Sequence, residues 1–299
     1  MASIAYKFDT DFPLPRKMTS SVASVLNPSP VLTGKEDEVL NALSAPSLTN
    51  VIMSGLVRDN GLVNFRNRGR FYAARNEQNK LEGVALMGHS ILFEAFTEDA
   101  IQAFATLARS EESIHLLMGE HTAVQKFWNY YADEGQSPRL VCPVIFLRRT
   151  EPFRESQSIP GLRPATQNDL EHVMCAQAAM AFETSGVDPL KKDPVGFRER
   201  YLRRIEKNRV WVLMKNGRLV FKTDVIAETP EAAYIEGVYV SPEERGKGIG
   251  RDCVSALGQI LLQHTRAIYL FVEQENTQTH SFYLNLGFSV GGQYDLLYF

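Results

Sequence analysis

The segment IEGVYVSPEERGKGIGR, residues 235–251, constrains the fold more than any other part of the chain. An apolar run typical of a β-strand ends in a loop with glycines at alternate positions, and a helical pattern follows. Glycine lets a backbone turn sharply and approach a ligand closely. The first N–H groups of a helix lack partners within the helix, and the helix dipole is positive at that end. The segment therefore predicts a binding site for a phosphate-like anion.

Three kinds of phosphate-binding loop can be compared with this segment. A P-loop requires G-x-x-x-x-G-K-[ST], which the segment lacks. A dinucleotide-binding loop requires a third glycine where Cys253 stands, and a βαβ unit that the neighbouring sequence does not predict. The third kind is the acetyl-CoA loop, with the pattern Arg/Gln-x-x-Gly-x-Gly/Ala. Arg245, Gly248 and Gly250 satisfy this pattern.

A second motif lies further along the chain. An Asn…Tyr-x-x-x-Gly-Phe pattern is formed by Asn276, Tyr283, Gly287 and Phe288. With both motifs, residues 161–299 resemble the GNAT superfamily of N-acetyltransferases, although Thr279 stands where the family usually has alanine. The resemblance implies an α/β fold in which a mixed, mostly antiparallel sheet is flanked by helices. It also implies that one strand splays away from its neighbour.

The resemblance implies that acetyl-CoA is the co-substrate and that no metal is needed. Backbone N–H groups of the loop would hold the pyrophosphate, the residues being Arg245, Gly246, Lys247, Gly248, Ile249, Gly250 and Arg251. The pantetheine arm would pair with the splayed strand at Val238, Tyr239 and Val240. Asn276 would lie beside this arm, and Tyr283 would be the general acid for the leaving thiolate. The Val238 amide would polarise the thioester carbonyl.

The base that deprotonates the acceptor amine is less well specified. Glu236 precedes Val238 by two residues, so strand alternation predicts that both side chains share one face. Glu236 can then deprotonate the amine directly or through water. The alternative is a structural ion pair between Glu236 and a basic neighbour such as Lys222. Glu183, expected in the loop before the second helix of this domain, is the candidate for holding the acceptor's ammonium group.

The chain is expected to contain two related domains. Residues 1–30, with four prolines, predict an extended arm, and the polar residues 151–160 predict a linker. Residues 31–150 repeat the element order of residues 161–299, which ends with two strands over residues 288–299. In the first copy, however, the strand at residues 90–96 leads through Thr97 directly into a helix. We therefore expect tandem GNAT-like domains, with a degenerate first copy, and with the splayed strand and acetyl-CoA loop only in the C-terminal copy.

Composition bears on which binding partners, metal sites and cell compartment are expected. The 32 basic and 35 acidic residues give a net charge of −3, which predicts neither nucleic acid nor a membrane surface as a partner. Three scattered cysteines argue against a disulfide framework or a cysteine-based zinc site, and the six histidines show no metal-ligand spacing. With no apolar N-terminal core of signal-peptide length, these features predict a cytoplasmic protein.

The predicted activity is direct transfer of an acetyl group from acetyl-CoA to a primary amine. The acceptor can be a small molecule or a protein, and the sequence leaves open whether the chain forms a homo-oligomer. The alternative is an acyl-CoA-binding regulatory or interaction module without turnover. Such a module would keep the loop but would not need Tyr283 or Glu236, so the presence of Tyr283 favours the enzyme.

Overall fold

The structure of the 299-residue chain is a computed structural model that describes residues 26–111, 114–153 and 158–299. It divides into two compact units. The first comprises the described residues up to Leu147 together with Phe271–Thr277 and Val290–Phe299, and the second comprises Arg148–Leu270 and Gln278–Ser289. Most of the expected arm, residues 1–25, and residues 154–157 of the expected linker lie outside the described residues.

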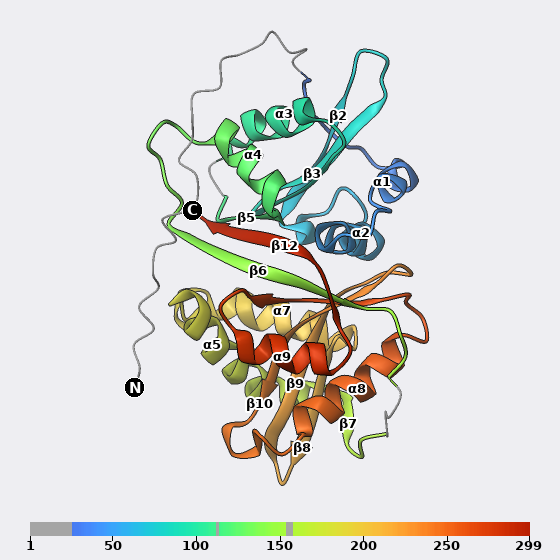
Figure 1. The fold of residues 1–299 in the computed structure, drawn as a ribbon, viewed down its shortest axis with the longest axis vertical. Coiled ribbons are helices and arrows are strands. Elements are labelled where there is room, and N and C mark those ends of the chain that lie inside the picture. The colour runs from blue at the N-terminus through green and yellow to red at the C-terminus, as the bar shows by residue number, and fades with distance from the viewer. Residues whose placement is uncertain (1–25, 112–113, 154–157) are drawn as a thin grey trace. The chain divides into compact units, whose positions relative to one another are not determined.

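The first unit is built on a mixed sheet with helices on both faces (Figure 1). In spatial order its strands are β1 (Ser29–Pro30), β2 (Gly69–Arg75), β3 (Leu81–Gly88), β4 (Ser90–Ala95), β5 (Leu116–Glu120), β12 (Ser289–Tyr298) and β6 (Leu140–Arg149). The helices are α1 (Glu36–Ala42), α2 (Leu48–Asn60), the 3₁₀ turn η1 (Phe65–Asn67), α3 (Glu98–Ala108) and α4 (His121–Tyr131). Apart from β1, η1 and β12, these elements match helices and strands expected from the sequence periodicity to within a few residues.

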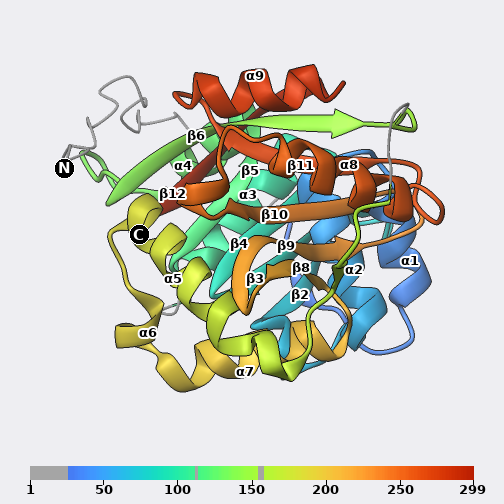
Figure 2. The ribbon, with the colours of Figure 1, turned by 90° about the horizontal axis from the view of Figure 1, so that it is seen from below.

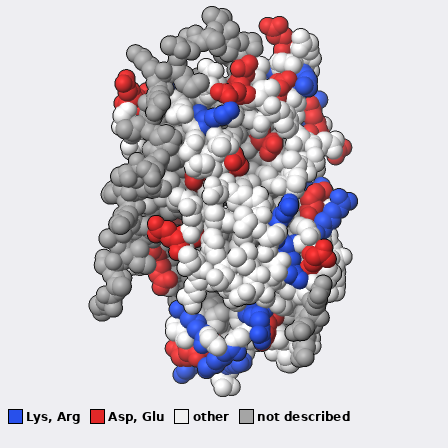
Figure 3. Space-filling view, viewed as in Figure 1, with Lys and Arg blue, Asp and Glu red and all other residues white. Residues whose placement is uncertain are grey.

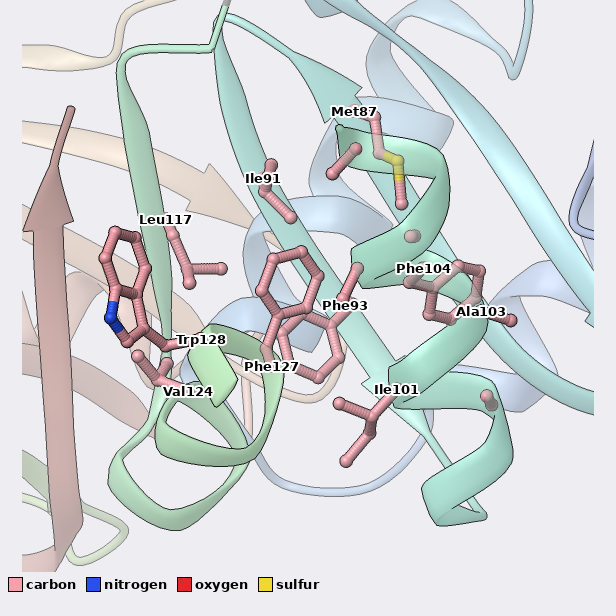
Figure 4. Close-up of a cluster of buried hydrophobic side chains, with 14 of the residues drawn as sticks. Met87, Ile91, Phe93, Ile101, Ala103, Phe104, Leu117, Val124, Phe127 and Trp128 are labelled. Carbon is pink, nitrogen blue, oxygen red and sulfur yellow. The ribbon is translucent and has the colours of Figure 1, made fainter. Parts of the chain in front are cut away.

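A large hydrophobic core lies between helices α3 and α4 and the sheet of the first unit (Figure 4). Buried residues of α3 recur every three or four positions, as at Ala100, Phe104 and Ala108, so that one helix face meets the sheet. Phe93 of β4 stacks on Phe127 of α4, with ring centroids 5.3 Å apart. The α3–α4 face of β4 is therefore filled by aromatic rings.

The second unit contains a sheet in the order β7, β8, β9, β10 and the first part of β11. These strands are β7 (Leu162–Pro164), β8 (Val210–Lys215), β9 (Arg218–Glu228), β10 (Ala233–Val240) and β11 (Ile268–Glu273). Asn216 and Gly217 join β8 to β9 with φ of 51° and 73°. This is the type I′ geometry that the Asn-Gly pair predicts.

Helices cover both faces of the second sheet. Figure 2 shows α8 and α9 on one face and α5, α6 and α7 on the other. The helical elements are η2 (Gln167–Asp169), α5 (Leu170–Ser185), α6 (Pro189–Lys192), α7 (Pro194–Glu206), η3 (Pro242–Glu244), α8 (Ile249–Leu261) and α9 (Thr277–Asn285). Thr166 and Asp169 form a capping box at the start of η2 and α5, with the Thr166 N–H donating to Asp169 Oδ2 at 2.7 Å.

Two expectations about strands need correction. Residues 288–299 form one strand, β12, instead of two, and β12 pairs antiparallel with β5, so that Leu297 faces Leu117. The splay is also not confined to the C-terminal copy. Parallel pairing between β4 and β5 covers only Ser90 with Leu116 and Ile91 with Leu117, and pairing between β10 and β11 is equally short.

The described residues carry a mixed surface charge. On the face drawn in Figure 3, acidic and basic side chains are interspersed. Of the helices described here, none is long and apolar enough to cross a bilayer. The described His, Cys, Asp and Glu side chains form no group of three or more that can hold a metal ion. The three cysteines are free thiols.

Candidate functional site

The junction of β10 and α8 has the geometry of an anion-binding loop. Gly246 and Gly248 have φ of 76° and 83°, a region that favours glycine, and Gly248 directly precedes α8. None of the described side chains caps this helix, and its first hydrogen bond runs from the Asp252 N–H to the Gly248 carbonyl. The N–H groups of residues 248–251 therefore have no acceptor within the described part of the chain, and they lie at the positive end of the helix dipole.

Three basic side chains surround this loop, and each has a local partner. Arg245 Nε donates to the Val240 carbonyl at 3.0 Å, and Lys247 lies 3.5 Å from Glu244. Arg251 Nε donates to Asp252 Oδ1 at 2.9 Å. All three side chains are exposed, so these contacts are weak and can be exchanged for contacts with a bound anion.

The loop is packed against the strand and the helix that carry the second motif. A Cβ added to Gly250 would lie 3.1 Å from Val240 Cγ2 and 3.7 Å from Phe282 Cζ, so α8 approaches both β10 and α9 closely. A Cβ added to Gly246 would meet nothing within 4 Å, which leaves open space beside the loop. The structure thus brings the glycine loop, Val240 and the helix of Tyr283 together within the second unit.

Strand β10 contains a bulge at the position expected to face the thioester. Glu236 pairs with Asp224 and Tyr239 with Lys222, so β10 has one extra residue between these pairs. Gly237, within the bulge, has φ of 64°. The extra residue interrupts the strand alternation. The prediction that Glu236 and Val238 share a face assumed an unbroken strand. Because the extra residue breaks the alternation between them, that prediction is wrong.

Glu236 is half-buried on β10 and takes part in a polar cluster. Its Oε2 accepts a hydrogen bond from the Tyr234 hydroxyl at 3.0 Å. The structural alternative paired Glu236 with Lys222: the Lys222 ammonium lies 3.0 Å from Asp224, and Glu236 acts on it as a further nearby negative charge. Asp224 is the cross-strand neighbour of Glu236, so two carboxylates lie on adjacent strands.

Tyr283 is a buried residue of α9. Its ring makes edge-on contacts with Phe282 and Phe288, at centroid distances of 4.9 and 5.4 Å. Burial raises the pKa of the Tyr283 hydroxyl well above its ordinary value, so the group stays protonated at neutral pH. A protonated donor is what the leaving thiolate requires. Asn276 precedes α9 in a segment counted with the first unit, so its place beside the pantetheine arm stays a prediction.

Glu183 lies in a different element from the one expected. It belongs to the last turn of α5, an exposed position, and not to the loop before the next helix. Gly186 ends α5 with φ of 70°, which is the usual glycine stop signal one residue after a helix. Helix α5 therefore continues through residues 183–185, although the Glu-Thr-Ser sequence there shows no helical spacing of apolar residues.

In the first unit, the corresponding strand-to-helix junction is that between β4 and α3, and it lacks the features of an anion-binding loop. Strand β4 leads into α3 through Thr97, whose hydroxyl accepts from the Ala100 N–H at 3.3 Å, and Glu98 and Asp99 occupy the first turn. A capped, acidic helix N-terminus disfavours an anion. The register between the described strands β3 and β4 also runs without a bulge.

Comparisons with known proteins agree with this geometry. Residues 177–288 match the sequence profile of the Acetyltransferase (GNAT) family. A Drosophila protein of known structure has a TM-score of 0.66 at 11% identity, covering 92% of this chain and 98% of its own. A GCN5-related N-acetyltransferase from Sphaerobacter thermophilus has a TM-score of 0.59 at 13% identity, covering 92% and 96%. A tandem GNAT protein from the clavulanic acid biosynthesis pathway has a TM-score of 0.56 at 14% identity, covering 91% and 98%.

At these identities the solved structures show the fold alone. No curated protein sequence matches the chain. The fold is thus a mixed α/β fold of the tandem GNAT type. Residues 177–288, which contain the glycine loop and Tyr283, belong to the GNAT family of acetyltransferases, whose general reaction is acetyl-CoA-dependent N-acetylation of an amine.

Proposed function

We propose that the second unit transfers the acetyl group of acetyl-CoA to a primary amine on a small molecule or a protein. The observation that carries this proposal is the uncapped N-terminus of α8, where the N–H groups of residues 248–251 are free and two positive-φ glycines precede them. Such a site fits a pyrophosphate. In the described part of the first unit, the helix in the matching position is α3. Its N-terminus is capped by a side chain and carries two acidic residues in the first turn.

The remaining residues of the site fit the rest of acetyl-CoA. Past Tyr234, β10 has no register partner in β11, so the edge at Val238, Tyr239 and Val240 is available to pair with the pantetheine amides. Loop residues Arg245 to Arg251 hold the pyrophosphate in this proposal, and Asn276 lies beside the arm. Acetyl-CoA supplies the acetyl group in activated form, as a thioester.

The protein's own groups then move protons and stabilise charge. The amine nitrogen forms the new bond to the acetyl carbon, and the carbon–sulfur bond breaks. Glu236 accepts the proton that the amine loses, directly or through water, while Tyr283 donates to the leaving sulfur. The Val238 amide donates to the carbonyl oxygen where negative charge develops. The exposed Glu183 carboxylate holds the ammonium form of the acceptor as it arrives.

We propose that residues 31–150 and 161–299 are the two copies of an internal duplication, and that the first copy does not bind acetyl-CoA. In the first copy, Phe93 of β4 packs on Phe127 of α4, so aromatic rings fill the space beside this strand. The first copy then serves recognition of the acceptor or of a partner. Its capped, acidic helix N-terminus supports this division of roles.

Isothermal calorimetry of the full chain with CoA and acetyl-CoA tests the proposal. We expect saturable binding, followed by release of CoA thiol when a suitable amine from a panel of classes is added. The panel contains small amines, amino-acid derivatives and lysine peptides. Absence of saturable CoA binding would overturn the acetyltransferase assignment. Binding without thiol release across the panel would instead favour an acyl-CoA-binding module.

A further inference from the structure

A buried ionic network lies on the α5–α7 side of the second sheet. The side chains of Lys222 and Asp224, both on β9, are 0% and 2% exposed, and Lys222 Nζ lies 3.0 Å from Asp224 Oδ2. The same oxygen accepts from the Tyr201 hydroxyl at 2.7 Å and from Arg204 Nη1 at 3.2 Å. Lys222 Nζ also donates to Gln177 Oε1 of α5 at 2.5 Å. The network therefore joins one strand to two helices.

This network lies directly against the bulge in β10. A Cβ placed on Gly237 would be 2.9 Å from both Lys222 Nζ and Gln177 Oε1. The hydrogen bond between these two groups thus packs on the Gly237 Cα, and no larger residue fits there without displacing it. On the same stretch of β9, Thr223 Oγ1 donates to the Glu236 carbonyl at 3.1 Å. Lys222 and Thr223, neighbours on β9, therefore both contact the bulged segment.

A role in stability alone explains this network poorly. Desolvation is the largest influence on Lys222 and lowers the pKa of its ammonium group, which means that burial of the charge is unfavourable. Buried ion pairs can often be replaced by apolar residues with no loss of stability. One oxygen of Asp224, Oδ1, is also buried without a hydrogen-bond partner among the described residues. The network instead holds the Gln177 and Lys222 side chains in a defined position against Gly237.

We propose that Lys222 is a positioning residue: held by Asp224 and Gln177, its ammonium group fixes the extra residue of β10 at Gly237 and so sets the direction of the Val238 amide. This inference rests on the proposed function, in which that amide polarises the thioester carbonyl. Lys222 touches no substrate, since its side chain is fully buried, and the role proposed for it is exerted through the backbone.

The double variant Lys222→Met/Asp224→Asn tests this role, because it removes one charge of each sign and keeps side chains of similar size. We expect kcat to fall about 10- to 100-fold, within or below the range known for loss of an oxyanion donor, with the Kd for CoA unchanged. In the free protein, amide hydrogen exchange in residues 233–240 should become faster. The matched control is Arg163→Met/Asp169→Asn, which removes the same two charges from another ion pair of this unit. It should alter neither kcat nor exchange in residues 233–240.

Two substitutions at Gln177 provide a test with less risk to folding. Gln177→Glu keeps an acceptor for the Lys222 ammonium and should preserve the slow exchange of residues 233–240, whereas Gln177→Leu should lose it. Unchanged exchange in Gln177→Leu, or a parallel loss of CoA binding and kcat in the double variant, would overturn the positioning role. The exchange measurement needs no CoA. A wild-type chain that fails to bind CoA would therefore overturn the proposed function separately.

Discussion

Replacing Gly248 by Glu should abolish most of the stabilisation that CoA gives to the protein. The new side chain would start 3.3 Å from Arg251 Nη2, at a residue whose φ is 83°, and would place a carboxylate at the N-terminus of α8. Each hydrogen bond to a charged group contributes about 1.5–3 kcal/mol, so the loss of two weakens CoA binding by about 3–6 kcal/mol, or roughly 10²- to 10⁴-fold.

Thermal unfolding provides the assay. At a CoA concentration of 100 times Kd, the wild-type protein gains about 2.7 kcal/mol, which corresponds to a rise in Tm of about 5–10 °C. At the same CoA concentration, Gly248→Glu should gain less than about 0.5 kcal/mol and show a rise of at most about 2 °C.

The matched control is Gly217→Glu, in the turn between β8 and β9. Gly217 also has a positive φ, of 73°, and no atom within 4 Å of an added Cβ, so the control introduces the same backbone strain and charge. Both variants should lose about 1–2 kcal/mol of stability without CoA, but only Gly217→Glu should keep the full shift with CoA. A full shift in Gly248→Glu would show that this loop does not bind the pyrophosphate.

Further expectations concern chemistry and pH. Tyr283→Phe keeps the ring packing and should lower kcat about 10²- to 10⁴-fold with CoA affinity unchanged, whereas Tyr72→Phe, in the first unit, should not. Glu236→Gln should lower the rate most below the pKa of the acceptor amine, and wild-type pH–rate profiles in both site variants would refute their roles. Hydrogen bonding from Arg163 lowers the pKa of Asp169 from 3.8 to about 2, so its stabilising effect is complete above about pH 4 and is lost as the pH falls through 2. In urea titrations Asp169→Asn should flatten this acid dependence, by at most about 2 kcal/mol because Arg163 is 42% exposed; an unchanged slope would contradict the assignment.

Local signals in the sequence predicted most elements and the glycine loop. Asn216 and Gly217 specify their turn, Thr166 and Asp169 specify a helix start, and apolar spacing specifies α3 and α8, because each depends on residues a few positions apart. The glycine pattern before α8 likewise reports a local backbone conformation.

Features that depend on distant residues were missed. The bulge in β10 arises from how this strand aligns with β9, and Gly237 alone does not reveal it. The network around Lys222 joins Gln177 of α5 to β9 across 45 residues of sequence. A lysine and an aspartate two positions apart in an otherwise apolar strand, FKTDV, were the available signal, since charges on a buried strand face need partners. Glu183 was misplaced because helix ends are the least well specified part of a helix.

The position of β12 has a consequence for how the chain is made. This strand, which ends one residue before the C-terminus, lies between β5 and β6 in the sheet of the first unit. At about 5–20 residues per second, a ribosome needs roughly 8–30 seconds to synthesise the residues that follow Leu147. During this time β5 and β6 can be formed, but each has an edge without its final partner. Unpaired strand edges promote association with other chains, so the newly made first unit exposes two such edges until residues 290–299 have been synthesised, and it needs protection from aggregation during that time.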